Sequence, residues 1–181
     1  MINNFGFDKG YDKTIKGINR QGYERTLSVS EWLQEGSTDE DALSFCRASR
    51  HFHNPTFSTP DPDIYNWDGS KMSDSYLVDI FCALATRYSD VTWATGYLSP
   101  TGPYITRDGQ DMGWDNARSY FYEALTSTDH AVKEAKFVKS FRAVGMVMHL
   151  LQDMAVPAHV RNDMSSHLLY SKSQSPLTKT I

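Results

Sequence analysis

Two histidines and an aspartate are spaced for metal binding in segment 149–159, which reads His-Leu-Leu-Gln-Asp-Met-Ala-Val-Pro-Ala-His. His149 and Asp153 are four residues apart, so on a helix they share one face and can converge on one ion. Pro157 is expected to stop this helix, which leaves His159 able to reach the same metal cluster from another direction. Imidazole and carboxylate are zinc-type ligands. For this pair alone the simpler explanation is a buried His bonded to a helix partner and an Asp near a helix end, so the metal interpretation needs a second cluster.

An acidic segment upstream contributes to that second cluster. Residues 35–41 read Glu-Gly-Ser-Thr-Asp-Glu-Asp. We expect a short helix after Leu27, with Ser28 or Ser30 as its N-cap and its end at Gly36. The carboxylates would then follow a helix C-terminus, where the helix dipole disfavours negative charge. Either solvent or a bound cation would relieve the repulsion.

A pair of histidines lies ten residues further on. His51 and His53 flank a phenylalanine ahead of an Asn-Pro turn, and only one of the two is expected to point inward. Alternatively, both are ordinary polar side chains exposed to solvent. Taken together, Asp41, His51, His149 and Asp153 would form a four-ligand site from separate segments. Both clusters occurring in one chain by chance is much less likely than either one alone.

The helix that carries the motif is expected to begin near Asp129, with Asp129 and Ser127 as capping residues. Gly145 lies one turn before His149 on the same side. At a cost of about 1 kcal/mol in helix propensity, a glycine there would let another backbone come close to the ligands. A helical wheel predicts one apolar arc facing the core, made of Phe137, Phe141, Val144, Val147, Met148 and Leu151.

Other segments complete an all-α architecture, a helical bundle with long loops. Helical periodicity predicts helices over residues 73–87 and 114–125. Prolines and small polar residues mark 54–71 as a long loop, and the aromatic, turn-rich stretch 92–112 has room for a small hairpin.

The chain divides into a polar arm or loop over residues 1–26, a helical metal-binding domain over 27–170 and a disordered tail over 171–181. At 181 residues and 40% hydrophobic content, it is large enough for one domain with a sizeable core. A net charge of −4 without a basic block argues against binding to duplex nucleic acid. No apolar window is long enough for stable membrane insertion, and the N-terminal residues do not have the pattern of a signal peptide.

These motifs resemble those of a known family. Segment 149–159 resembles the His-x-x-x-Asp-x-x-x-x-x-His signature of the zinc-dependent phospholipase C family, which the fungal single-strand-specific zinc nucleases share. The run from His51 to Pro55 resembles that family's His-Phe-x-Asp-Pro segment, and the segment that ends at Asp41 resembles its acidic loop. The similarity spans roughly residues 27–165, and its segments occur in the same order along the chain.

The resemblance implies a zinc-dependent phosphodiester hydrolase of the phospholipase C type. Zinc would be held by Asp41, His51 rather than His53, His149 and Asp153, and Asp41 would serve both as a ligand and as the catalytic base. Asp153 would bridge two ions. The substrate would be a phospholipid or a single-stranded nucleic acid, and the protein would be secreted or periplasmic.

Departures from the family pattern lower the expected activity. The family's N-terminal Trp and early His have no counterpart, and four residues beyond His167 the family's Glu is replaced by Ser171. Only one of the family's three zinc sites is complete, although His159 and His167 could hold a second ion weakly. We therefore expect a chain that lacks segments of a longer protein, or a degenerate relative, with turnover near background. A non-catalytic, metal-stabilised binding domain is the alternative.

The only two cysteines, Cys46 and Cys82, are expected to form a disulfide, because members of the family that the chain resembles are mostly exported. Such a bridge would tie the His51 loop to the next helix and contribute about 3 kcal/mol. Two buried thiols in a reducing compartment are the alternative.

Overall fold

The structure is a computed structural model, and it describes two long stretches of the chain and two short ones. Helices make up most of these residues, and a single two-stranded sheet accompanies them in the described part of the chain. The mainly helical fold confirms the all-α prediction in its coarse form. The described residues are 10–42, 51–53, 90–95 and 111–160.

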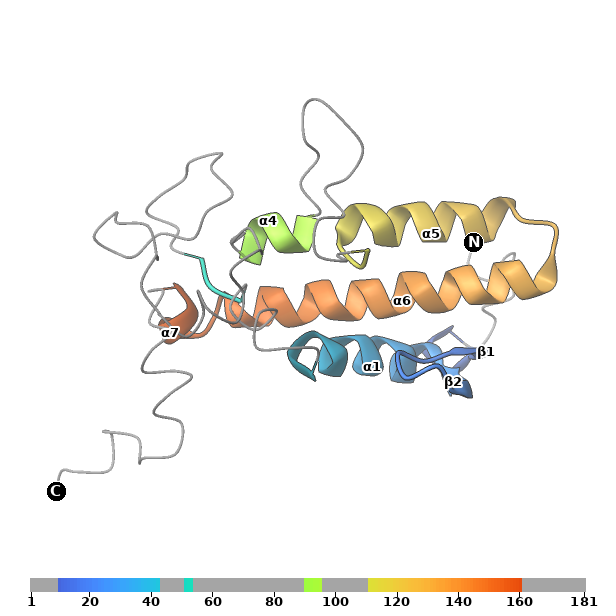
Figure 1. The fold of residues 1–181 in the computed structure, drawn as a ribbon, viewed down its shortest axis with the longest axis horizontal. Coiled ribbons are helices and arrows are strands. Elements are labelled where there is room, and N and C mark those ends of the chain that lie inside the picture. The colour runs from blue at the N-terminus through green and yellow to red at the C-terminus, as the bar shows by residue number, and fades with distance from the viewer. Residues whose placement is uncertain (1–9, 43–50, 54–89, 96–110, 161–181) are drawn as a thin grey trace, which may run out of the picture.

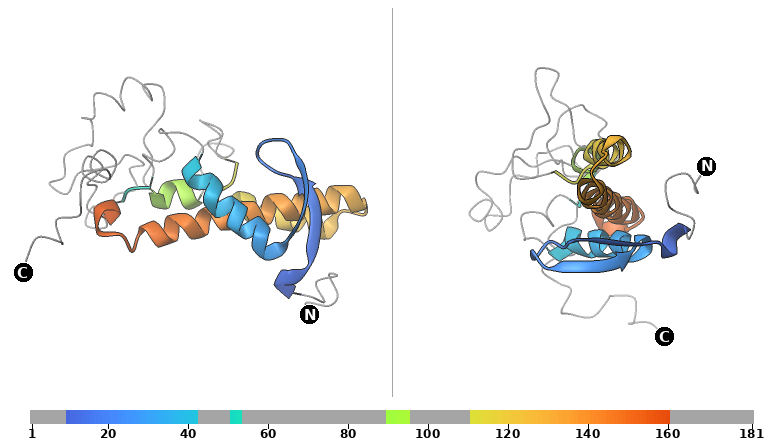
Figure 2. Two further views of the ribbon diagram at one scale, coloured as in Figure 1. Left: turned by 90° about the horizontal axis from the view of Figure 1, so that it is seen from below. Right: turned by 90° about the vertical axis from the view of Figure 1, so that its right-hand side faces the viewer.

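One long helix, α6 (His130–Asp153), is the axis of the molecule. Helix α1 (Val29–Ala42) packs along one side of it and α5 (Trp114–Thr126) along another, as Figure 1 and Figure 2 show. The short helix α4 (Asp90–Thr95) lies on the same side as α5 but nearer the C-terminal end of α6. This arrangement brings the ends of α1 and α6 and the start of α4 to one end of the bundle.

The N-terminal residues form a hairpin. A short 3-10 turn, η2 (Gly10–Asp12), leads into strand β1 (Thr14–Ile18), which pairs antiparallel with β2 (Glu24–Ser28). Gly22, with φ of 85°, adopts the left-handed conformation that the connection requires. The hairpin replaces the loop or loose arm predicted for this segment. Its strands are polar and bury chiefly Ile15, so the alternation of apolar and polar residues is too weak to predict strands.

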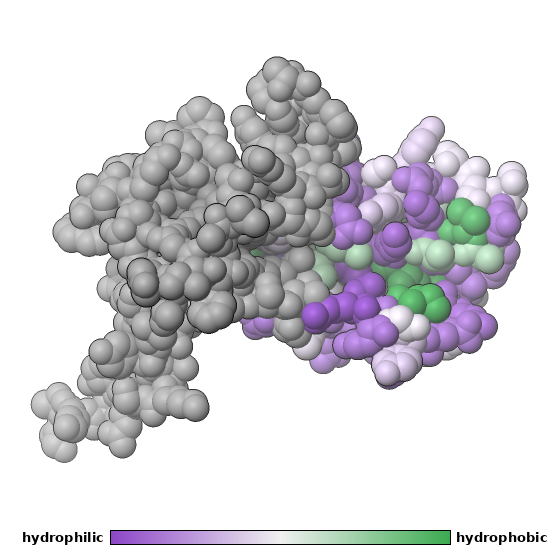
Figure 3. Space-filling model, in the orientation of Figure 1, coloured by the Kyte–Doolittle hydropathy of each residue, from purple (hydrophilic) through white to green (hydrophobic). Residues whose placement is uncertain are grey.

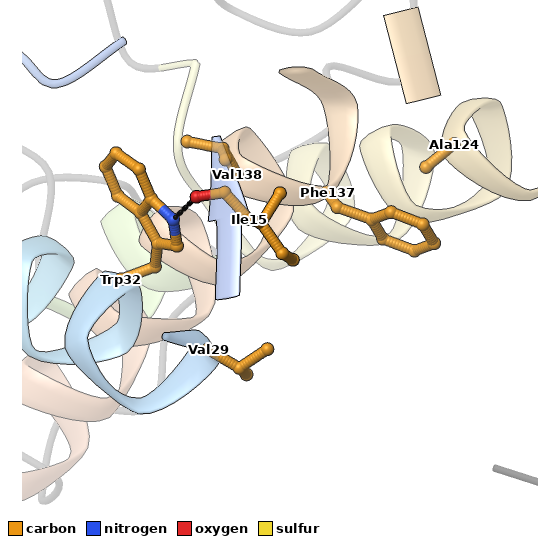
Figure 4. Close-up of a cluster of buried hydrophobic side chains, with 6 residues drawn as sticks. All are labelled: Ile15, Val29, Trp32, Ala124, Phe137 and Val138. Atoms are coloured by element: carbon orange, nitrogen blue, oxygen red, sulfur yellow. Dashed lines mark hydrogen bonds between the residues drawn. The ribbon is translucent and has the colours of Figure 1, made fainter. Parts of the chain in front are cut away.

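The hairpin is attached to the helices through a buried apolar cluster (Figure 4). Ile15 belongs to one cluster with Trp32 of α1 and Val138 of α6, and the Trp32 indole Nε1 donates a hydrogen bond of 3.1 Å to the Ile15 carbonyl oxygen. Each large apolar side chain buried in this way contributes roughly 1.5–3 kcal/mol. The cluster consists of Ile15, Val29, Trp32, Ala124, Phe137 and Val138.

Helix α1 is longer than the sequence suggested. Ser28 and Glu31 form a reciprocal cap, in which the Glu31 carboxylate accepts from the Ser28 N–H at 2.7 Å and Ser28 Oγ accepts from the Glu31 N–H at 3.2 Å. The helix then continues through Gly36, which was predicted to end it, as far as Ala42. Asp41 therefore lies in the last helical turn rather than in a loop beyond the helix.

A close backbone crossing between α1 and α6 explains why Gly36 lies inside the helix. A Cβ atom on Gly36 would overlap the Arg142 carbonyl oxygen, and one on Gly145 would overlap that of Leu33. The prediction that Gly145 allows another backbone to approach is confirmed. At the same crossing, Arg142 Nη2 donates to Asp39 Oδ2 at 2.7 Å in a buried ion pair.

The N-terminus of α6 is capped as the sequence indicated. Asp129 Oδ1 accepts hydrogen bonds from the N–H groups of Ala131 at 2.8 Å and Val132 at 3.1 Å. We expect Asp129→Ala to lower the free energy of unfolding by about 1 kcal/mol, because it leaves these donors without the cap. Asp129→Asn keeps an acceptor oxygen and should retain most of the stability. Urea denaturation of the three proteins tests this, and equal losses in both variants would contradict it.

The buried face of α6 is wider than the predicted arc. Met148 and Leu151, which the helical wheel placed in the core, are 45% and 65% exposed. The reason is that α1, α4 and α5 contact α6 from several directions, so a single apolar stripe does not describe its burial. Its buried residues are Phe137, Val138, Ser140, Arg142, Ala143, Gly145, Met146, Val147, Leu150 and Asp153.

Helix α6 ends at Asp153, before Pro157 is reached. Pro157 instead begins a further helical turn, α7 (Pro157–Val160), which corrects the expectation that it stops the motif helix. A proline suits the first position of a helix because its fixed φ is helical and its missing N–H is not needed there. The turn between the helices, closed by the Val156 N–H donating to the Asp153 carbonyl at 2.8 Å, brings His159 back into the interior.

The predicted helix over 114–125 is confirmed by α5. In the 92–112 stretch the described start belongs to helix α4, not to a hairpin. The predicted helix 73–87, the loop 54–71, the tail and the proposed Cys46–Cys82 bridge lie outside the described residues. None of the helices in the described ranges is both long and apolar enough to cross a membrane. In the view of Figure 3, the surface of the described residues is mainly hydrophilic, with a few apolar residues among the polar ones.

Candidate metal centre

Three elements bring the predicted ligands together at one end of the bundle. Asp41 comes from the last turn of α1, His51 from the short segment 51–53, and His149 from the last turns of α6. One ligand atom from each of these three residues lies within 4.8 Å of the others. Side chains that are about a hundred residues apart in sequence therefore meet at one point, as the sequence analysis predicted.

Asp153 joins this group through contacts to both histidines. Its Oδ2 lies 2.9 Å from His51 Nδ1 and 3.4 Å from His149 Nε2. On the other side, Asp41 Oδ1 lies 3.6 Å from His51 Nδ1 and 3.4 Å from His149 Nε2. Each histidine therefore presents one nitrogen to both carboxylates.

One of these distances, 2.9 Å between His51 and Asp153, is of hydrogen-bond length, and the other three are longer. Ligand bonds of 2.0–2.1 Å to zinc make the edge of the tetrahedron roughly 3.4 Å. Three of the four nitrogen–oxygen distances, 3.4, 3.4 and 3.6 Å, lie near that value and exceed a good N–H···O hydrogen bond. Asp153 Oδ2 is buried and makes no hydrogen bond of acceptable geometry within the described structure. Asp41, His51 and His149 thus form a group that could hold a metal ion, and Asp153 contacts both of its histidines.

His159, the fifth predicted ligand, is buried beside the other oxygen of the same carboxylate. Its Nδ1 lies 3.3 Å from Asp153 Oδ1, and its ring packs against Phe52 with the centroids 4.7 Å apart. The His53 N–H donates to the His159 carbonyl at 3.1 Å, which ties segment 51–53 to α7. Asp153 therefore faces His51 and His149 with one oxygen and His159 with the other.

The charges of the cluster favour ionised partners. Burial alone would lower the pKa of His51, but the close carboxylates of Asp153 and Glu40 outweigh it and raise the pKa to about 9. Burial would raise the pKa of Asp153, but contacts from His149, His159 and His51 hold it well below its usual range. These contacts favour the protonated forms of His51 and His149 beside the Asp153 carboxylate. A metal ion would replace those protons.

His149 and Asp41 form the open side of the cluster. Interaction with Asp153 raises the pKa of His149, against a smaller effect of its partial burial. The Asp41 side chain is 66% exposed, whereas His51 and Asp153 are buried. An exposed carboxylate beside buried imidazoles gives the site one side from which a substrate or water could approach.

The neighbouring histidine His53 lies outside this group. It is half-buried, and burial lowers its pKa. His53 is not among the residues whose ligand atoms converge in the described structure. Its exclusion as a ligand stays a prediction, and His167 lies outside the described residues.

Two buried carboxylates near the site were not predicted. Glu40 is fully buried and accepts a hydrogen bond of 2.8 Å from Trp93 Nε1. Burial, with the charge of Asp153, raises the pKa of Asp90 to about 7, while His51 partly offsets the effect. Glu40 could have been suspected because it lies next to Asp41. Nothing local marks Asp90, because only the folded chain brings α4 to this end of α6.

Comparisons with known proteins do not extend this description. No family model matches the sequence, and no curated protein or solved structure shows significant similarity to it. The case for the site therefore rests on its own donor atoms and distances.

Proposed function

We propose that the chain binds one zinc ion through Asp41, His51, His149 and Asp153, and that this centre serves phosphodiester hydrolysis of the phospholipase C type. The observation that supports the proposal most directly is the geometry of the cluster. One ligand atom each of Asp41, His51 and His149 lies within 4.8 Å of the others, and Asp153 contacts both histidines. Three of the four nitrogen–oxygen distances are near the edge length of a tetrahedral zinc site. The motif resemblance supplies the reaction class.

Zinc bound there would supply Lewis acidity toward a phosphoryl oxygen and lower the pKa of a coordinated water. The protein residues divide the remaining work. The two histidines and the buried Asp153 fix the geometry of the centre, because they are held by packing and by mutual contacts. Asp41 is exposed and lies where a substrate would enter, which suits a ligand that also accepts a proton from the attacking water.

The second candidate is a non-catalytic domain that the metal only stabilises. The extensive burial of His51, Asp153 and His159 favours it, since structural sites are closed whereas catalytic sites keep an open position. The exposure of Asp41 argues for the hydrolase. A phospholipid or a single-stranded nucleic acid remains the proposed substrate, and a secreted or periplasmic location remains a proposal that follows from the resemblance.

An activated phosphodiester separates these candidates. With zinc supplied, we expect the wild type to hydrolyse bis(4-nitrophenyl) phosphate only slightly above background, because only one zinc site is complete. We expect no hydrolysis above background by Asp41→Asn, because this variant has no ionised carboxylate to take the proton. Zinc content measured in parallel shows whether the site is loaded. If zinc-loaded wild type is no faster than the metal-free protein, the hydrolase proposal fails and the stabilised domain is correct.

The same protein then decides the substrate class. Short-chain phosphatidylcholine and single-stranded DNA are assayed side by side, each with zinc and with chelator. Zinc-dependent cleavage of the lipid alone supports the phospholipase C type. Cleavage of DNA alone moves the function to the nuclease alternative.

A further inference from the structure

We infer that Glu40 is a positioning residue that fixes the His51 ring for metal binding through Nδ1, an inference that rests on the proposed zinc centre. The two nitrogens of His51 face opposite partners. Nδ1 lies near Asp41 and Asp153, at 3.6 and 2.9 Å, and therefore faces the proposed ion. Nε2 lies 3.6 Å from Glu40 Oε1, on the far side of the ring.

This geometry determines which nitrogen carries the proton. An imidazole that binds metal through Nδ1 keeps its hydrogen on Nε2, and that hydrogen needs an acceptor. His51 Nε2 is buried and has no hydrogen bond of acceptable geometry within the described residues. The Glu40 carboxylate is the nearby acceptor, and a shift of a few tenths of an ångström would complete the hydrogen bond.

Glu40 is itself held in place from the opposite direction. Trp93 Nε1 on α4 donates a hydrogen bond of 2.8 Å to the same oxygen, Oε1, that faces His51. Both the Trp93 and Glu40 side chains are buried. A buried carboxylate is costly unless hydrogen bonds compensate for its lost hydration. The chain Trp93–Glu40–His51 therefore connects α4 to the proposed ion through a histidine whose tautomer it selects.

Glu40 is not a further metal ligand. It contacts the nitrogen of His51 that faces away from Asp41 and Asp153, so an ion at the proposed centre would lie across the ring from it. Carboxylates in this outer position orient the ligand and raise its basicity, and their loss typically lowers metal affinity about 10- to 100-fold. We expect an effect of this kind, with no change in the number of ions bound.

Glu40→Gln is the primary test, because glutamine keeps the shape and an acceptor oxygen but removes the charge. We expect its zinc affinity, measured by competition with a chromophoric chelator, to fall about tenfold. Trp93→Phe removes the donor that orients Glu40 and should lower affinity in the same direction by a smaller factor. The matched controls are Glu35→Gln, which changes another glutamate on α1, and Trp32→Phe, which removes a buried indole donor of the apolar cluster. Both controls should bind zinc as the wild type does.

A second measurement distinguishes positioning from a general loss of structure. Two-bond ¹H–¹⁵N spectra of the zinc-loaded wild type should show His51 protonated at Nε2 and metal-bound at Nδ1. If the Glu40→Gln affinity lies within about twofold of the wild type, or if zinc binds His51 at Nε2, the positioning role is wrong while the zinc site stands. If the wild type binds no zinc, the proposed centre fails and the role of Glu40 fails with it. If Glu40→Gln does not fold, the zinc affinity of Trp93→Phe tests the positioning role instead.

Discussion

Zinc should raise the melting temperature of the wild-type chain, and His149→Ala should abolish the rise. An ion that binds only the folded state stabilises it in proportion to the logarithm of its concentration, by about 4 kcal/mol at a thousand times its dissociation constant. His149 supplies one of the two imidazoles and contacts both carboxylates of the cluster. Its removal leaves three ligands, one of them exposed. Thermal unfolding followed by circular dichroism, with zinc and with chelator, measures the difference.

His130→Ala is the control for this experiment. It removes a histidine from the same helix, but one that is 83% exposed on its side chain and lies at the opposite end of α6. We expect this variant to gain as much stability from zinc as the wild type gains. Equal zinc-induced shifts in His149→Ala and wild type would contradict the site. A shift that is kept in His149→Ala but lost in His130→Ala would show that zinc binds elsewhere.

The motif helix could be predicted because its signals are local. The Asp129 cap, the four-residue spacing of His149 and Asp153, and the permissive Gly145 each depend on neighbours within a turn or two. That His51 belongs to the site could be predicted only by combining its own segment with segment 149–159. The structure confirms that Asp41, His51 and His149 converge, whereas the identity of the metal stays a prediction.

The errors occur where tertiary contacts outweigh local preference. Gly36 carries a common helix-ending signal, yet α1 continues through it, because the backbone of α6 occupies the space that a side chain would need. The hairpin buries chiefly Ile15 and so showed no alternating pattern. Glu40 and Trp93 are 53 residues apart, and no local rule pairs them. Each of these features depends on which elements pack together, and sequence spacing does not encode that.

Gly145→Ala, like Gly36→Ala, should be among the most damaging conservative changes in the helical core. The added Cβ would overlap the Leu33 carbonyl oxygen and would lie 2.9 Å from the carbonyl carbon of the same residue and 3.0 Å from the Ser37 nitrogen. These are backbone atoms, so no side chain can rotate away and the helices must separate. We expect a loss of more than about 3 kcal/mol in the free energy of unfolding, despite the higher helix propensity of alanine. Urea denaturation measures it.

Val132→Ala is the matched control, since it also places an alanine on α6, but at a position that is exposed to solvent. Its stability should stay within about 0.5 kcal/mol of the wild type. A similarly small effect of Gly145→Ala would mean that the crossing is looser than the structure shows. Gly145 also lies one turn before His149, and Asp41 lies on the opposing helix. If the helices separate, the ligands on α1 and α6 must separate too, so Gly145→Ala should weaken zinc binding although it touches no ligand.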